Sequence, residues 1–279
     1  MIKHQNTYLH KKSGSTMMKP LRLTIAVLAF SMASIVVAQP PGSKAPPAGP
    51  APVNAEGRVV LGGKNPADKG IWTPVFGILE PISPYAGIPF QPWSKAVYDY
   101  RQTRELEPHT RCKASGAARQ FLTPYGVEFL EMTELKQLYI FDIGGPHTFR
   151  TIYMDGRAHP TEWQPTNYGH SVGHWEGNAL VVDTVGYNEE FWMDRRGLPH
   201  TNKLHTIERF NRTDKNTIDY RLTIDDTGAY TKTFEGGFKL RWNQGEELFE
   251  YVCQQANYAT ELMVGTGGTS VDRSSSIVP

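Results

Sequence analysis

The chain has 279 residues, of which 39% are hydrophobic, 20% charged and 11% aromatic, and its formal net charge is +1. The aromatic content and the balanced charge exclude a wholly disordered chain, and two cysteines are too few for a small disulfide-framed scaffold. The composition is that of a folded protein with one main domain.

The first 38 residues are predicted to be a secretory signal peptide. They hold five basic and no acidic residues, and an apolar run at 23–38 ends in small residues before Gln39. The alternative is a membrane anchor, but the run is short for a span of about 20 residues. We expect cleavage after Ala38, a periplasmic or secreted product, and no membrane span after cleavage. Cleavage leaves 24 basic and 28 acidic residues, a formal charge of −4 that argues against a nucleic-acid partner.

The remaining chain divides by composition into three parts. Residues 39–67 are predicted to be a linker, because 39–57 is rich in Pro, Ala and Gly and cannot bury a core. Residues 68–263 are expected to fold as one β-rich domain, and residues 264–279 are expected to form a flexible tail.

One helix and about nine strands are expected in the domain. The helix is predicted at 93–107, where apolar residues recur at helical spacing until Pro108 ends it. From Tyr125 onward the apolar pattern has a period of two, with turn residues every eight to twelve positions, which is typical of consecutive antiparallel strands. The expected strands are 127–132, 136–143, 148–154, 171–176, 179–185, 204–211, 217–224, 232–242 and 247–254.

The order of these strands favours a mainly all-β fold, an antiparallel up-and-down β-barrel of the lipocalin or calycin kind with one short N-terminal helix. Closure of the barrel removes the exposed edges that invite aggregation. A two-sheet β-sandwich is the alternative. Cys112 and Cys253 lie at opposite ends of the domain and are predicted to form a disulfide in an oxidising compartment. The alternative is that both cysteines are buried free thiols.

Polar residues are concentrated between Arg150 and Arg209. The segments IYMDGRAHP, GHSVGHWEGNALVVDTVGYN and GLPHTNKLHTIERF, with RCKASGAAR upstream and LFEYVCQQAN near the end, resemble a large group of exported bacterial β-rich proteins. The resemblance covers about residues 70–258 and implies export and a β-rich fold. It implies no particular activity, so function has to be inferred from the residues.

Metal binding and nucleophilic hydrolysis are weakly supported by this region. His170 and His174 are four residues apart, but along a strand that spacing is about 13 Å, too far for one ion. No cofactor is predicted, although a zinc or iron site assembled across strands from His159, His170 and His200 with a carboxylate stays open. Ser171 in GHSVG fits the nucleophile-elbow pattern, but the helix that should follow the serine is absent from the sequence.

Acid–base chemistry is the remaining expectation for this region. Its predicted catalytic residues are His159, His170, His200, Asp155 and Glu208. The predicted substrate-binding residues, which hold negative charge or provide aromatic surface, are Arg157, Arg209, Tyr168, Trp175 and Trp192. The structural alternatives are that Asp155 caps a turn while Arg157 pairs with a surface carboxylate, and that an internal Glu–Arg pair has no catalytic task.

These residues lead to an expected function with two alternatives. The expected function is that of an exported, cofactor-independent lyase, isomerase or hydrolase acting on a small, partly apolar or aromatic molecule in a barrel pocket. A barrel that binds such a ligand unchanged is the alternative, and a metal-dependent enzyme is the third hypothesis. Convergence of the three histidines on an acidic partner in one pocket would favour catalysis, whereas their scatter over the surface would favour binding.

Overall fold

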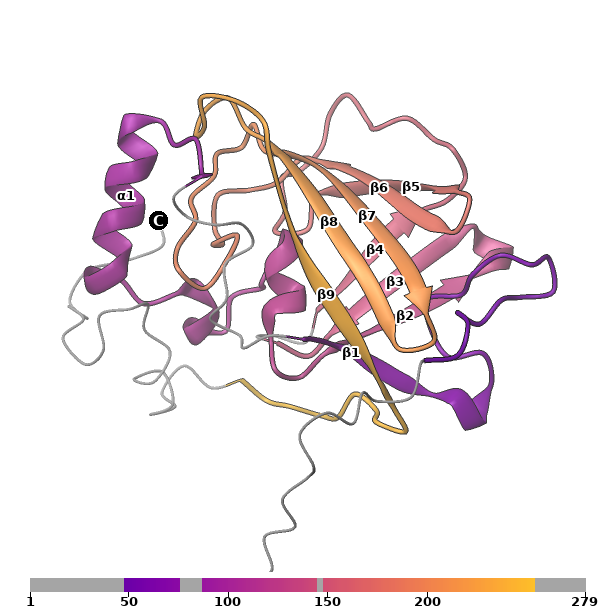
Figure 1. The fold of residues 1–279 in the computed structure, drawn as a ribbon. Helices are drawn as coiled ribbons and strands as arrows, with labels where there is room; N and C mark the ends of the chain where they lie inside the picture. The colour runs from indigo at the N-terminus through magenta and orange to yellow at the C-terminus, as the bar shows by residue number, and fades with distance from the viewer. Residues whose placement is uncertain (1–47, 76–86, 145–147, 254–279) are drawn as a thin grey trace, which may run out of the picture. The chain divides into compact units, whose positions relative to one another are not determined.

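The structure is a computed structural model that describes residues 48–75, 87–144 and 148–253 (Figure 1). All of these residues belong to one compact unit, and residues 1–47 lie outside the described residues. The predicted signal peptide, its cleavage site after Ala38 and the predicted tail at 264–279 also lie outside them. In the described ranges, no helix is both long and apolar enough to cross a membrane.

Nine strands form a closed barrel in which strands adjacent in sequence are paired, and β1 pairs with β9 to complete it (Figure 1). The strands are β1 (Gly70–Pro74), β2 (Val127–Met132), β3 (Gln137–Asp142), β4 (Thr148–Tyr153), β5 (His170–Glu176), β6 (Ala179–Val185), β7 (His205–Asp214), β8 (Thr217–Asp225) and β9 (Phe234–Gln244). The mainly β fold and the closed barrel agree with the sequence analysis, and the two-sheet sandwich is not formed. Eight of the nine expected strand ranges overlap β2 to β9 to within three residues at each end.

Alternation along the strands separates the interior of the barrel from its outer face. In β8, Ile218, Tyr220, Leu222 and Ile224 are buried, and the residues between them are at least partly exposed. Several aromatic side chains pack against one another in the interior: the ring of Phe121 lies 5.1 Å from that of Tyr220 and 5.5 Å from that of Phe210. These side chains belong to one continuous buried core.

One pair of strands departs from the expected antiparallel arrangement. β4 and β5 run parallel, with Ile152 opposite Ser171 and Tyr153 opposite Val172. Parallel neighbours cannot be joined by a tight hairpin, so the chain must return along the barrel before β5 begins. The connection, residues 154–169, contains four of the predicted site residues, Asp155, Arg157, His159 and Tyr168.

The strand that closes the barrel was not predicted, and the strand expected at 247–254 is not formed. β1 is short, begins with Gly70 and ends with Pro74, and pairs with β9 at five positions. Residues 247–253 have no regular structure, and residue 254 lies outside the described residues. A closed barrel leaves no free edge with which this last segment could pair. Its aromatic residues instead pack on Tyr125, whose ring lies 5.6 Å from that of Tyr251.

The described residues also form helices outside the barrel strands. The α-helix α1 (Pro92–Arg104) overlaps the range expected from the sequence and ends three residues earlier, since Glu105 is already extended. It is anchored by Ser94, whose hydroxyl donates to the carbonyl of Ala229 at 2.5 Å. Four short 3₁₀ helices complete the described regular structure, namely η1 (Pro66–Asp68), η3 (Pro108–Arg111), η4 (Ala117–Leu122) and η5 (Thr133–Leu135).

Two further contacts tie the ends of the domain to the barrel. The predicted disulfide between Cys112 and Cys253 is present, with Cα atoms 5.6 Å apart and a sequence separation of 141. At the other end, Val59 and Leu61 lie in the described part of the linker expected at 39–67; both are buried, and Leu61 belongs to the core. Trp72 in β1 holds this segment, because its indole N–H donates to the carbonyl of Leu61 at 2.7 Å.

Candidate functional site

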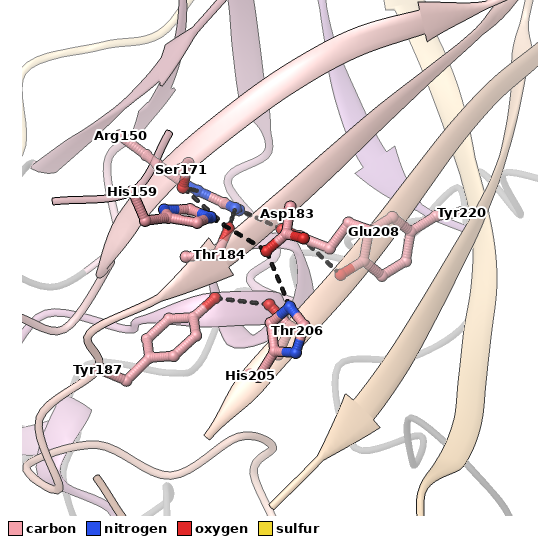
Figure 2. Close-up of polar contacts among 10 residues, drawn as sticks. All are labelled: Arg150, His159, Ser171, Asp183, Thr184, Tyr187, His205, Thr206, Glu208 and Tyr220. Carbon is pink, nitrogen blue, oxygen red and sulfur yellow. Dashed lines mark hydrogen bonds and ion pairs between the residues drawn. The ribbon is translucent and has the colours of Figure 1, made fainter. Parts of the chain in front are cut away.

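The polar residues between Arg150 and Arg209 are divided by strand alternation into an inner and an outer set, which Figure 2 shows together. In β7, Thr206 and Glu208 are buried, whereas His205 and Arg209 lie on the exposed side. In β6, the neighbouring residues Asp183 and Thr184 face opposite sides, with Thr184 buried. A hydrogen-bonded network has formed within each set.

The inner network is built on an ion pair between Arg150 and Glu208, both fully enclosed in the barrel (Figure 2). The guanidinium also donates to Ser171 Oγ at 2.9 Å and to Thr184 Oγ1 at 2.7 Å. The hydroxyl of Tyr220 donates to the other Glu208 oxygen at 2.9 Å. Burial alone lowers the pKa of Arg150, but the Glu208 carboxylate raises it above its ordinary value, so the guanidinium stays charged. Glu208 therefore has a structural partner and no solvent access.

The outer network consists of His159, His170, Asp183 and His205, here called the histidine cluster. Nε2 of His159 lies 3.2 Å from Asp183 Oδ1, and Nε2 of His205 lies 2.8 Å from the same oxygen (Figure 2). Nδ1 of His159 lies 2.8 Å from Nδ1 of His170. Asp183 is thereby the common acceptor for two imidazoles, and His159 connects it to the third.

Strand register explains why these side chains meet. Asp183 in β6 is directly opposite Val172 in β5 and Ile207 in β7. His170 and His205 are each two residues from those partners, which places them at diagonal positions on the same outer face. The β4–β5 connection then brings His159 onto this face.

The positions of the protons follow from the hydrogen-bonding capacity of each group. An ionised Asp183 can only accept, so His159 and His205 each donate from Nε2. A neutral His159 then accepts at Nδ1, and its partner His170 must donate from Nδ1. This assignment leaves Nε2 of His170 unprotonated. Burial, followed by the proximity of His159 and Arg157, lowers the pKa of His170, which favours this neutral form.

The β4–β5 connection also places an aromatic ring and a guanidinium beside the cluster. The ring of Tyr153 stacks on His170 with centroids 5.1 Å apart, and the Arg157 guanidinium lies 4.0 Å from the Tyr153 ring centroid. Arg157 donates to both carboxylate oxygens of Asp155, which lowers the pKa of Asp155 to about 2. Asp155 is thus held as an ion-pair partner of Arg157 and remains ionised.

Across the described ranges, no group of three or more His, Cys, Asp or Glu side chains is arranged to hold a metal ion. Comparison with family models, with curated proteins and with solved structures finds no match.

Besides Glu208, two further predicted site residues are buried away from the histidine cluster. His200 has Nε2 3.0 Å from the carbonyl of Phe191 and its ring 4.2 Å from the Phe191 ring. Burial lowers the pKa of His200 to about 4, so it is neutral and structural. Trp192 is buried against Arg101, whose guanidinium lies 4.9 Å from its ring.

The remaining predicted substrate-binding residues have separate partners. Arg209 pairs with Glu176 on the outer face at 2.5 Å, and the ring of Trp175 lies 4.3 Å from the guanidinium of Arg58. The hydroxyl of Tyr168 lies 2.5 Å from Thr148 Oγ1 and donates to a buried carboxylate at 3.4 Å.

That carboxylate, Asp142 at the end of β3, also accepts from the backbone N–H of Gly144 at 2.7 Å. Burial raises the pKa of Asp142 to about 7, and the hydrogen bonds offset this only in part. A carboxyl group inside the domain therefore titrates near neutral pH.

The sequence analysis did not select Asp183 or His205 as site residues. Each is a polar residue on the solvent-exposed face of its strand, and the alternation of polar and apolar residues along a strand predicts such a face. The local sequence does not predict that the two side chains meet, because their contact depends on the register between β6 and β7.

Proposed function

We propose that the protein is a cofactor-independent enzyme, a lyase, isomerase or hydrolase, that uses the histidine cluster for general acid–base catalysis. The supporting observation is the hydrogen-bonded series His205, Asp183, His159 and His170, which orients three imidazoles from one carboxylate. Such an arrangement fixes the tautomer of each ring and prepares one nitrogen to accept a proton.

His170 is the proposed general base. Its Nε2 carries no proton in the neutral cluster, and its lowered pKa keeps the ring neutral around pH 7. When His170 takes a proton from the substrate, its Nδ1–H stays bonded to His159, and Asp183 stabilises the positive charge through His159.

The proposed substrate is a small molecule with an aromatic or partly apolar body. Tyr153 offers a ring beside His170, and Arg157 can stabilise negative charge that develops on the substrate. This substrate would bind on the outer face of the barrel. The interior pocket expected from the sequence is not supported, because core side chains occupy the interior among the described residues.

The test is a comparison of turnover between the wild type and His170→Gln on a panel of aromatic and terpenoid esters, hydroxy acids and enolisable carbonyl compounds. Loss of the base should reduce kcat by about 10²- to 10⁴-fold, the usual contribution of general acid–base catalysis. The matched control is His174→Gln, since His174 lies four residues further along β5 and pairs with Glu176 outside the cluster.

The outcomes separate the proposal from its alternatives. Turnover that survives His170→Gln, or that falls equally in the control, contradicts the assigned role. A panel member that binds near His170 without conversion favours the alternative, a barrel that binds its ligand unchanged. Activity that depends on added zinc or iron favours the third hypothesis, a metal-dependent enzyme.

The proposal includes export and a lipocalin-like topology. The disulfide supports export, because such bonds persist in oxidising compartments. The sequential order of the strands supports the lipocalin-like topology, although the parallel β4–β5 pair departs from a pure up-and-down barrel. Secretion of the processed chain beginning at Gln39 would test the first, and an experimental structure would test the second.

A further inference from the structure

Two adjoining cavities lie where residues 54–63 cross the end of the barrel next to the β2–β3 turn. The larger has a volume of about 670 Å³ and the smaller about 360 Å³. Arg58, Glu131 and Thr133 line both, so the two cavities adjoin, and together they are here called the end groove. Its volume is in the range of small-molecule sites, which span about 300–1,000 Å³.

The end groove has apolar walls in both parts. Leu61, Phe129 and Leu138, all members of the buried core, line the larger cavity. Met154 and Trp175 line the smaller one. A ligand with an apolar body could therefore contact apolar side chains in both parts.

The charged residues around the groove differ in whether they already have an ion-pair partner. The Arg58 guanidinium is occupied by Glu131 at 2.6 Å and stacks on Trp175, and Asp155 is occupied by Arg157. Lys136, at the turn into β3, lines the smaller cavity, and its ammonium makes no ion pair or hydrogen bond with the described part of the chain.

One acidic residue of the groove, Glu56, also has no ion pair among the described residues. It lines the larger cavity, whereas Lys136 lines the smaller one. The uncompensated charge next to Met154 and Trp175 is therefore positive. This end of the groove favours an anionic group.

We propose that the end groove is a binding site for a small amphipathic carboxylic acid. The apolar body lies on the core residues of the larger cavity, and the carboxylate pairs with Lys136 near Trp175. The site is distinct from the histidine cluster and is independent of the proposed catalysis.

Titration calorimetry of the full disulfide-bonded chain with dodecanoate tests the proposal. We expect saturable binding of about one dodecanoate per chain, and much weaker binding of dodecylamine, which places a positive charge beside Lys136. Lys136→Gln should weaken dodecanoate binding roughly tenfold, the effect of one charge-assisted hydrogen bond. Lys232→Gln is the matched control, because Lys232 is also exposed but lies in the β8–β9 connection.

A second variant tests the apolar part. Thr133 is exposed and lines both cavities, so Thr133→Trp should fill the groove and abolish binding while the chain remains folded. The proposal is overturned if dodecanoate does not saturate, if Lys136→Gln binds like the wild type, or if dodecylamine binds equally well. Loss of binding in His170→Gln but not in Lys136→Gln would place the ligand at the histidine cluster and would also overturn it.

Discussion

Replacement of Asp142 by Asn should change how the stability of the domain depends on pH. Burial raises the pKa of the Asp142 carboxyl from about 3.8 to about 7 in the folded chain. The folded chain therefore binds more protons than the unfolded chain between these values, and this group makes stability fall as pH rises. A shift of about three units at 1.36 kcal/mol each corresponds to about 4 kcal/mol, lost between pH 4 and pH 7.

Urea unfolding of wild type and Asp142→Asn at several pH values between 4 and 8 measures this effect. The wild-type profile alone is insufficient, because burial lowers the pKa of His109 and of His200 to about 4. The unfolded chain binds more protons at those histidines between pH 4 and about 6.5, so they make stability rise over that range. Both histidines are present in the variant, and the difference between the two proteins isolates Asp142.

The expected difference has a defined shape. The free energy of unfolding of Asp142→Asn, relative to wild type, should increase by about 1.4 kcal/mol per pH unit between pH 4 and pH 7 and then level off. A difference in unfolding free energy that is the same at every pH would represent only the change in hydrogen bonding to Gly144 and Tyr168. A difference that does not vary with pH, or that decreases as pH rises, would refute the assignment of a neutral buried carboxyl group.

The inner network and the disulfide allow two further predictions. Glu208→Gln should destabilise the domain by about 3–5 kcal/mol in urea unfolding, because it leaves the buried Arg150 charge without its partner. Arg150→Met combined with Glu208→Leu should cost less than the sum of the two single changes, and additive costs would contradict their coupling. Serine at both Cys112 and Cys253 should lower the free energy of unfolding by up to about 4–5 kcal/mol, the chain-entropy value for a loop of this length. An unchanged urea midpoint with intact two-state unfolding would contradict that stabilisation.

Local periodicity was sufficient to predict most of the barrel strands. The alternation of Ile218, Tyr220, Leu222 and Ile224 with polar residues determines both the strand and its buried face. β1 lacked such a signal, since five residues bounded by Gly70 and Pro74 are too few for a period to emerge. The segment at 247–253 had the signal but no unpaired strand beside it, because closure is a property of the whole barrel.

The site was less predictable than the fold for a related reason. Residue type and local pattern indicated His159 and His170, and the structure brings these two together. His200 has the same side chain but lies in the packed core, where a histidine is held neutral. Asp183 joins the cluster because of inter-strand register, and register depends on tertiary packing rather than on local sequence.

The parallel β4–β5 pair is the place where the barrel closes on itself. From β5 through β9 and β1 to β4, every other pair of neighbouring strands is antiparallel. Only two residue pairs join β4 to β5, and across this short seam Tyr153 of β4 lies against His170 of β5. His159 comes from the connection between the same two strands and reaches His170 and Asp183. A change that opens this seam would therefore separate Tyr153 and His159 from the rest of the proposed catalytic group.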